Sequence, residues 1–446
     1  MLSPMSDIIL VNLTGPDRPG ITRDLSGIMG QHGVRILDIG QSVIHDMLTL
    51  GMLIGLPPES ESHPVLKDIL FKAHEWDLQI RFNPISSGDY ERWVDAQGKP
   101  RHIMTMLGPQ LSAHHLAGLG AVVTHHGLNI DHITRLSGRV SLIREPERPR
   151  ACVEFSMRGA PDDPSALRAD LLDLSQELGV DIAIQVDNVF RRNRRMVAFD
   201  MDSTLIQIEV INELAAAAGV GDEVAAITRD AMNGKIDFKE ALRRRLRPLK
   251  GLPTSVLDDI IDRLPITDGA ERLIRTLKTL GYKTAILSGG FTYVGDYLQK
   301  RFGIDHVHAN VLASKDGVLT GEVDGPIVDG QRKAELLREL ADKEGIRLEQ
   351  VIAVGDGAND LPMLQAAGLG IAFHAKPTVK ASAKQALSTL GLDGILYLIG
   401  MSDREVAQAL ATASGDGGSL LSRTPCGECG VNERTEGPVP FPAGRS

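Results

Sequence analysis

The sequence of 446 residues lacks the features that mark several common classes of protein. No apolar run approaches the roughly 18 to 20 residues that a membrane-spanning helix needs. The first twenty residues lack the basic stretch and cleavage site of a signal peptide. Three cysteines are too few for a disulfide framework, which favours a reducing compartment. The formal charge of −10 offers no basic field for nucleic acid or anionic lipid. We therefore expect a cytoplasmic protein that binds neither membranes nor nucleic acid.

The composition and length are those of a multidomain globular protein. Apolar residues make up 42% of the chain and charged residues 24%, which is close to the averages for globular proteins. At roughly 150 residues per domain, the length allows about three domains.

One structural pattern occurs twice in the first part of the chain. β-rich segments and amphipathic helices follow one another in the order βαββαβ over residues 7–84 and again over 101–187. Each unit predicts a ferredoxin-like sandwich, in which two helices cover one face of the sheet and the other face needs a partner. We therefore expect pairing, either within the chain or between chains. The polar segment 86–101 predicts a linker.

From residue 195 to about 400 the pattern changes. Apolar strands are expected at 196–200, 283–288 and 351–356, and a helical insert at about 209–264 separates the first two. Strands that alternate with helices predict a parallel sheet with its site at the carboxyl ends of the strands. The fold class is therefore α/β, with a Rossmann-like core and a helical cap. Residues 414–446, rich in glycine and proline, predict a disordered tail.

Polar residues follow the ends of the predicted strands. Asp200 and Asp202 come just after the first strand, and Thr204 adds a hydroxyl. Paired carboxylates suit a divalent metal or acid–base chemistry, although they suit a helix cap equally well. Ser288 and Gly289 follow the second strand, in a turn whose amides can approach an anion.

Two further signals follow later in the chain. Lys333 begins a helix and suits the neutralisation of phosphoryl oxygens, although a single lysine is more often solvated. Asp356, Asn359 and Asp360 lie on a glycine-rich turn that leads into a helix, where an Asx turn with a cap is the simpler interpretation. Four such signals in one order are hard to explain by turns and caps alone.

These motifs together resemble a known family. DMDST, LSGG, the Lys333 region and GDGAND are similar to the four motifs of the haloacid dehalogenase superfamily of aspartate-nucleophile phosphatases. FDMDSTLIQIEVINELA, AMNGKIDFKEALRRRL and LSGGFTYV further resemble its phosphoserine phosphatase family. The resemblance implies Mg²⁺-dependent hydrolysis of O-phospho-L-serine to L-serine and phosphate, the last step of serine biosynthesis, through an aspartyl-phosphate.

The resemblance also implies catalytic roles. Asp200 would be the nucleophile, and Asp202 would protonate the leaving group and then activate water. The Asp200 carboxylate, the Asp202 backbone carbonyl and Asp356 would hold Mg²⁺.

The same resemblance implies how substrate is bound. Phosphoryl oxygens would meet Ser288, the Gly289 amide and Lys333, with Asn359 and Asp360 supporting the metal side.

The cap residues would select the substrate. Glu209 would meet the ammonium group of serine and Arg245 its carboxylate, while Met232 and Phe238 would form an apolar wall. Without this resemblance, the simpler interpretation of Met232 and Phe238 is that they are core residues. Arg245 would then be a solvated charge, and Glu209 would cap the next helix.

A loop in the first βαββαβ unit places Asp17, Arg18, Pro19 and Gly20 between a strand and a helix start. Unpaired amides at a helix start attract a carboxylate, although a capped turn explains the loop as well. The unit resembles the ACT domain, a module that commonly senses amino acids and pairs side by side. The second unit lacks this loop and resembles the ACT domain more weakly. The resemblance implies serine as an effector and a homodimer.

Alternative functions remain open at this point. The chain would otherwise be a phosphatase or phosphotransferase for another small phosphorylated amino acid, such as phosphothreonine or homoserine, or a non-catalytic amino-acid sensor. Cys426 and Cys429 have the spacing of half a metal site but are more simply two free thiols. Two histidine pairs are interpreted as surface or core histidines: His114, His115, His125 and His126.

Overall fold

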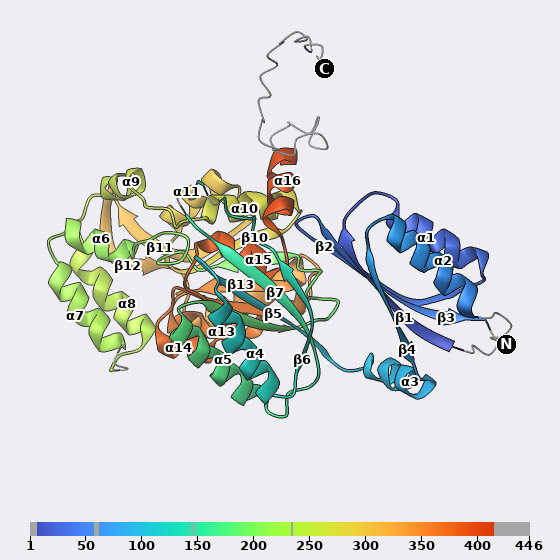
Figure 1. The fold of residues 1–446 in the computed structure, drawn as a ribbon. Coiled ribbons are helices and arrows are strands. Elements are labelled where there is room, and N and C mark those ends of the chain that lie inside the picture. The colour runs from blue at the N-terminus through green and yellow to red at the C-terminus, as the bar shows by residue number, and fades with distance from the viewer. Residues whose placement is uncertain are drawn as a thin grey trace, which may run out of the picture. The chain divides into compact units, whose positions relative to one another are not determined.

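The structure is a computed structural model that describes residues 7–57, 62–141, 143–144, 146, 148–232 and 235–413. It divides between Lys99 and Pro100 into two compact units (Figure 1). The predicted tail, with Cys426 and Cys429, lies outside the described residues.

The first unit is a four-stranded antiparallel sheet with two helices on one face (Figure 1). The strand order is β2-β3-β1-β4. Its core forms between the alternate residues of β1 and β3 and the apolar faces of both helices. The elements are β1 (Asp7–Pro16), α1 (Ile21–Gln31), β2 (Arg35–Ile44), β3 (Met47–Leu56), α2 (Ser62–Glu75) and β4 (Gln79–Ile85).

The segment interpreted as a linker contains a helix, α3 (Ser87–Ala96). Ser86 caps it, because its Oγ accepts a hydrogen bond of 3.0 Å from the Asp89 N–H. The helix buries none of its residues, so a local cap rather than an apolar face accounts for it.

The second unit begins with the same βαββαβ order. The strand order β6-β7-β5-β8 matches that of the first sheet, and two helices again cover one face. The elements are β5 (Arg101–Gly108), α4 (Ala113–His125), β6 (Asn129–Arg135), β7 (Ala151–Arg158), α5 (Pro164–Leu178) and β8 (Asp181–Val186). The ferredoxin-like prediction is confirmed for both repeats.

The other face of this second sheet is covered by the same chain. Leu107, Cys152 and Ala183 point away from α4 and α5 and join the hydrophobic core of the following domain. This repeat therefore finds its partner internally.

The last domain is built on a seven-stranded sheet of order β12-β11-β10-β9-β13-β14-β15. All neighbouring strands are parallel except β11 and β12, so the predicted Rossmann-like core is confirmed. The central strands are buried on both faces, as helix-covered parallel strands must be. The strands are β9 (Met196–Phe199), β10 (Lys283–Phe291), β11 (His306–Lys315), β12 (Val318–Asp324), β13 (Val351–Gly355), β14 (Leu369–Phe373) and β15 (Gln385–Leu387).

Helices follow the strands and also form a cap between β9 and β10. The cap contains α6 (Val210–Ala217), α7 (Gly221–Met232), α8 (Phe238–Leu246), the 3₁₀ turn η1 (Arg247–Leu249) and α9 (Ser255–Asp262). The core helices are α10 (Ala270–Thr279), α11 (Thr292–Phe302), α12 (Gly330–Lys343), α13 (Leu361–Ala366), α14 (Pro377–Ser382), α15 (Ile395–Leu398) and α16 (Asp403–Ala413). Short 3₁₀ turns lie at Leu348–Gln350, Ala358–Asp360 and Leu392–Gly394.

Polar contacts fasten β8 of the second repeat to the segment around β15. Asp181 Oδ2 accepts hydrogen bonds from the backbone N–H groups of Ser388 and Thr389, both at 2.8 Å, and from Thr389 Oγ1 at 2.6 Å. The Gln385 side chain accepts a hydrogen bond from the Ile184 N–H through Oε1 and donates one from Nε2 to Ile184 O. Since Asp181 is 3% exposed, these bonds are largely shielded from water.

Replacing Asp181 with alanine is expected to lower the free energy of unfolding by about 1–3 kcal/mol, because two partly buried N–H groups lose their acceptor. Urea unfolding of the full chain measures this change. The exposed Asp173→Ala variant on α5 is the matched control, with an expected change within about 0.5 kcal/mol. Equal stability of both variants would show that these bonds contribute nothing.

Candidate active site

Three neighbouring strands bring the motif residues to one edge of the sheet. β9 lies between β10 and β13 and runs parallel to both. Asp200 follows β9, Ser288 lies near the end of β10, and Asp356 follows β13. The Asp200 N–H donates to Val354 O at 2.8 Å, which continues the strand pairing up to the carboxylate.

The loop after β9 turns back toward the sheet through a left-handed residue. Ser203 has a φ of +57° and its N–H donates to Ile208 O at 3.2 Å. Its Oγ donates to Glu209 Oε1 at 2.9 Å. Glu209 occupies the N-cap position of α6, but its side chain makes no capping hydrogen bond. Ser203, which holds Glu209, was not predicted.

Lys333 is the cationic centre of the site. It lies in the first turn of α12, which Asp329 caps by accepting from the Arg332 N–H at 2.8 Å. The fully buried Nζ lies 2.8 Å from Asp200 Oδ1 and 2.7 Å from Asp360 Oδ1. Burial acts to lower the pKa of Lys333, but the two carboxylates raise it above its usual value. Lys333 is therefore a charged, buried lysine rather than a solvated one.

Asp356 and Asp360 add two carboxylates beside Asp200. Burial, followed by the charge of Asp200, raises the pKa of Asp360 to about 6. Burial and the charges of Asp200 and Asp360 raise that of Asp356 to about 7. One oxygen from each of the three carboxylates lies within 4.8 Å of the others. Lys333 and the Gly357 N–H, at 3.0 Å, engage both oxygens of Asp360, whereas Lys333 meets only Oδ1 of Asp200. Asp200 Oδ2 and the Asp356 carboxylate are therefore better able to hold a cation.

Asp202 is buried, and its Oδ1 has no hydrogen-bond partner among the described residues. Burial, then the charges of Glu209 and Asp200, raise its pKa well above the usual range. A Cβ at Gly290 would lie 2.9 Å from Asp202 Oδ2, so only glycine allows this approach. Thr204 is fully buried nearby in sequence, and within the described chain its hydroxyl is also unpartnered. Burial and the neighbouring carboxylates therefore favour the protonated form of Asp202.

The Ser-Gly-Gly turn is held by a buried asparagine. Ser288 Oγ accepts from the Gly290 N–H at 2.9 Å. Asn310 in β11 donates from Nδ2 to Gly289 O at 2.8 Å and accepts from the Val328 N–H at 2.8 Å. Asn310 is fully buried and was not predicted. The available signal was a single amide side chain inside the apolar stretch HVHANVLAS.

The cap helix α8 brings two predicted residues to the core. A Cβ at Gly289 would lie only 2.8 Å from the ring of Phe238, so the glycine lets this ring lie close against the turn. Burial lowers the pKa of Arg245, while the charges of Glu209 and Asp202 act to raise it. Arg245 Nε is buried and has no hydrogen-bond partner in the part of the chain that the structure describes. The side chain of Met232 lies outside the described residues.

The Asn359 side chain lies close to Gly357, where a Cβ would come within 2.2 Å of its Oδ1. Asn359 and Asp360 both lie in the short 3₁₀ turn after β13, and their role in supporting the metal side stays a prediction.

The predicted regulatory loop belongs to the other unit and has local partners there. The Arg18 guanidinium donates to Trp76 O and lies 5.9 Å from the centre of the Trp76 ring. The Asp17 N–H donates to Asp46 O at 2.7 Å. Gly20 has a φ of +100° and stands directly before α1. Amino-acid binding at this loop, including Pro19, stays a prediction.

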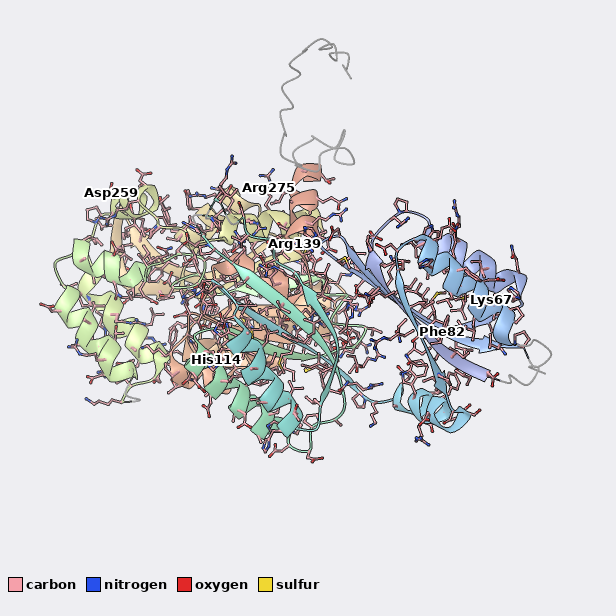
Figure 2. All side chains as sticks on the ribbon, viewed as in Figure 1. Lys67, Phe82, His114, Arg139, Asp259 and Arg275 are labelled. Carbon is pink, nitrogen blue, oxygen red and sulfur yellow. The ribbon has the colours of Figure 1, made fainter. Side chains whose placement is uncertain are left out.

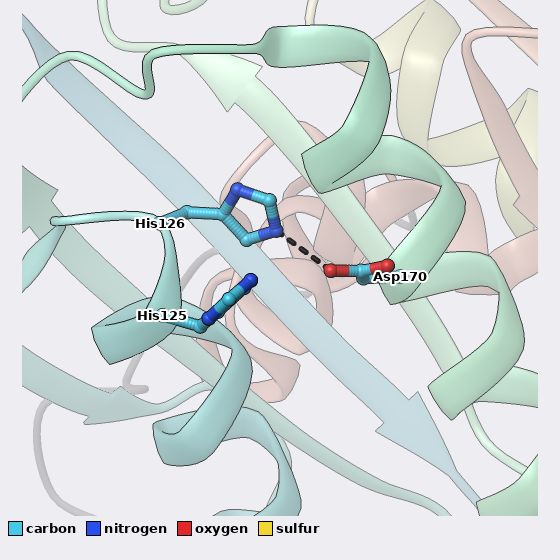
Figure 3. A group of neighbouring side chains, drawn as sticks. All are labelled: His125, His126 and Asp170. Atoms are coloured by element: carbon cyan, nitrogen blue, oxygen red, sulfur yellow. Dashed lines mark hydrogen bonds and ion pairs between the residues drawn. The ribbon is translucent and has the colours of Figure 1, made fainter.

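One of the histidine pairs has a partner that the sequence did not reveal. His126 Nε2 lies 2.8 Å from Asp170 Oδ2 of α5, and the ring of His125 meets that of His126 edge-on at 5.0 Å (Figure 3). His114 is exposed on α4 (Figure 2), and His115 completes a capping box with Ser112. These histidines lie in the second repeat, and none belongs to the catalytic motifs.

Comparison with known proteins agrees with this geometry. Residues 7–83 and 100–185 match models of the ACT domain, and residues 195–368 match the haloacid dehalogenase-like hydrolase model. No helix in the described part of the chain is long and apolar enough to cross a membrane.

Relatives match over almost their whole length. A phosphoserine phosphatase of Streptomyces coelicolor is 42% identical, covering 93% of this chain and 98% of the relative. A phosphoserine phosphatase of Mycobacterium tuberculosis is 38% identical, covering 91% of this chain and 96% of the relative. The solved structure of a probable phosphoserine phosphatase from Vibrio cholerae, without ligand, has a TM-score of 0.52 and 33% identity over 70% of this chain and 88% of that one. The chain therefore belongs to the phosphoserine phosphatase family of haloacid dehalogenase-like hydrolases, with two ACT domains preceding its hydrolase domain.

Proposed function

We propose that the protein is a Mg²⁺-dependent phosphatase that hydrolyses O-phospho-L-serine to L-serine and phosphate, the last step of serine biosynthesis. The observation that carries this proposal is the grouping of Asp200, Asp202 and Lys333 beneath a cap that supplies Arg245. An acid, a nucleophile and a buried cation are the groups that phosphoryl transfer through a covalent intermediate needs.

The reaction would proceed in two steps on the chain's own carboxylates. Asp200 attacks phosphorus, and the bond to the seryl oxygen breaks as the aspartyl-phosphate forms. Asp202 donates its proton to that oxygen, which its raised pKa allows. Asp202 then accepts a proton from water, which attacks phosphorus, releases phosphate and restores Asp200.

The remaining motif residues would hold the phosphoryl group. Lys333 is charged and within reach of Asp200, so it offsets negative charge where the phosphoryl oxygens arrive. Ser288 and the Gly289 amide would bind the other oxygens. Asn359 and Asp360 would support the turn that carries Asp356.

The carboxylates fit a hard divalent cation. Three oxygens lie close enough together to share one. The pKa of Asp356 is raised first by burial and then by the charges of Asp200 and Asp360, and a cation would relieve this repulsion. Asp200, the Asp202 backbone carbonyl and Asp356 would hold Mg²⁺. When bound, the ion supplies positive charge that reduces repulsion between nucleophile and phosphoryl oxygens.

The cap would select a zwitterionic amino acid. Glu209 offers a carboxylate for its ammonium group, and Arg245 offers a forked donor for its carboxylate. Glu209 is pre-oriented by Ser203, and Phe238 lies against Gly289 above the turn. Met232 would extend this apolar wall.

The ACT domains support two further proposals, a serine effector at Asp17 to Gly20 and a homodimer. In the first unit β2 is an edge strand with exposed apolar side chains, Ile44 being 76% and Ile39 47% exposed. Such an edge invites a second strand. The cytoplasmic location stays a prediction.

Changing Asp200 to asparagine is expected to lower kcat/KM for O-phospho-L-serine at least about 10³-fold, because the amide cannot attack phosphorus. Phosphate release with Mg²⁺ measures this, and Asp222→Asn on the exposed start of α7 is the matched control. Phosphothreonine and an aryl phosphate are tested alongside. Turnover of the aryl phosphate alone would disprove the substrate, and unchanged activity of the variant would disprove the nucleophile.

Glu209→Gln is expected to move the alkaline limb of the kcat/KM profile to lower pH. The Glu209 charge helps to raise the pKa of Asp202, so its removal lets Asp202 lose its proton at lower pH. Glu213→Gln, which removes a cap carboxylate paired with Arg263, is the control and should leave the limb in place. A limb that stays in place in Glu209→Gln would separate Asp202 from general acid catalysis.

L-serine is expected to bind to the full chain, and Asp17→Asn should weaken this binding whereas Asp77→Asn should not. Calorimetric titration measures the affinity, with each substitution made in a chain that also carries Asp200→Asn. Light scattering of the same proteins measures whether the chain is a dimer. Equal binding by both variants, or a monomer at working concentration, would contradict the corresponding proposal.

A further inference from the structure

A cavity of about 870 Å³ lies beside the cap helix α8 and is separate from the catalytic motifs. Its walls come from α8 and the turn after it, from β12 and from the start of α12. Asp200, Asp202 and Lys333 do not line it. A volume of this size suits a small-molecule ligand rather than a single ion.

Basic side chains dominate the lining. Lys239, Arg243 and Arg247 follow one another at intervals of four residues, so they form one stripe along α8 and its end. Lys250 follows in the next turn, and Arg332 faces them from α12. This stripe lies on a different side of the helix from Phe238 and Arg245, which serve the active site.

Two of these cations are already neutralised by carboxylates of the lining. Lys239 Nζ lies 3.1 Å from Asp329 Oδ2. Arg332 lies 3.2 Å from Glu335, and it also pairs with Glu339 at 2.6 Å. These pairs therefore contribute little attraction for a ligand.

Three cations of the cap side remain uncompensated. Among the described residues, no hydrogen bond or ion pair involves the side chains of Arg243, Arg247 or Lys250. All three are exposed. The lining carboxylate that also lacks a partner within the described chain is Glu322. Three positive charges against one negative charge leave a local excess of two, which favours an anion.

The walls of the cavity are held together where the cap meets the core. The Gly251 N–H donates to Leu319 O and the Leu319 N–H to Leu252 O, both at 2.8 Å. Gly321, with a φ of +81°, brings β12 against the carbonyl of Arg247, where a Cβ would lie at 3.2 Å. The cations are thus presented by a built junction rather than by a free helix surface.

We propose that this cavity binds a small molecule with two or more phosphate groups. Arg243, Arg247 and Lys250 lie along one stripe of α8 and its end, so their charges can meet neighbouring phosphate groups of one ligand. The ion pairs of Lys239 and Arg332 border this stripe and are not needed for binding.

Calorimetric titration of the full chain with tripolyphosphate, without Mg²⁺, tests the binding. The double variant Arg243→Gln/Arg247→Gln is expected to bind at least tenfold more weakly than wild type. Arg244→Gln is the matched control, because Arg244 pairs with Glu240 at 2.7 Å and does not line the cavity. The variant Arg243→Lys/Arg247→Lys keeps the charge and should retain binding.

Binding at the active site cannot produce this difference, because its residues are the same in all variants. Equal affinities in wild type, double variant and control would overturn the proposal. Should the double glutamine variant unfold, as judged by its thermal melting, Arg247→Gln and Lys250→Gln are measured singly, and the loss of binding must then appear in at least one of them.

Discussion

The ammonium group of Lys333, buried between Asp200 and Asp360, is the constraint on which the site depends. A buried charge costs several kcal/mol unless it is paired and hydrogen-bonded, and here two carboxylates do so at 2.8 and 2.7 Å. This requires α12 and the turn after β13 to approach closely. A Cβ at Gly355 would lie 2.4 Å from Asp360 Cγ, and one at Gly330 would lie 2.4 Å from Asn359 O. The close approach that the ion pair requires therefore explains why glycine stands at both positions.

The charge balance of the cluster explains both its pKa values and its affinity for cations. Asp200, Asp202, Asp356 and Asp360 meet a single buried lysine, so negative charge predominates. The pKa values of Asp202, Asp356 and Asp360 are all raised, with burial as the largest cause and neighbouring carboxylates next. Such a cluster favours either protons or a divalent cation. The acid and the metal ligands that we propose therefore arise from one arrangement.

The sequence predicted the fold and the grouping of the motif residues because strand order determines both. Parallel strands end at one edge, so Asp200, Ser288 and Asp356 had to meet there. Their supporting contacts were not predictable in this way. Asn310 reaches Gly289 from another strand, and it is the tertiary arrangement that brings the two together.

Local effects account for the other differences between sequence and structure. Ser203 adopts a left-handed backbone conformation, which is uncommon for serine and could not be predicted from the sequence. In this conformation its hydroxyl donates to Glu209. The segment interpreted as a linker forms α3 through the cap at Ser86, although it has no buried face.

The two ACT repeats also differ in a way that follows from packing. The second repeat lacks the Asp-Arg-Pro-Gly loop, and its sheet is joined to the hydrolase core through Cys152 and Asp181. A repeat whose sheet face serves as part of the enzyme's core cannot rearrange for a ligand without disturbing β15, whereas the first repeat keeps the loop and an apolar edge strand. The effector site that we propose is therefore placed in the first repeat, while the second repeat packs against the hydrolase core.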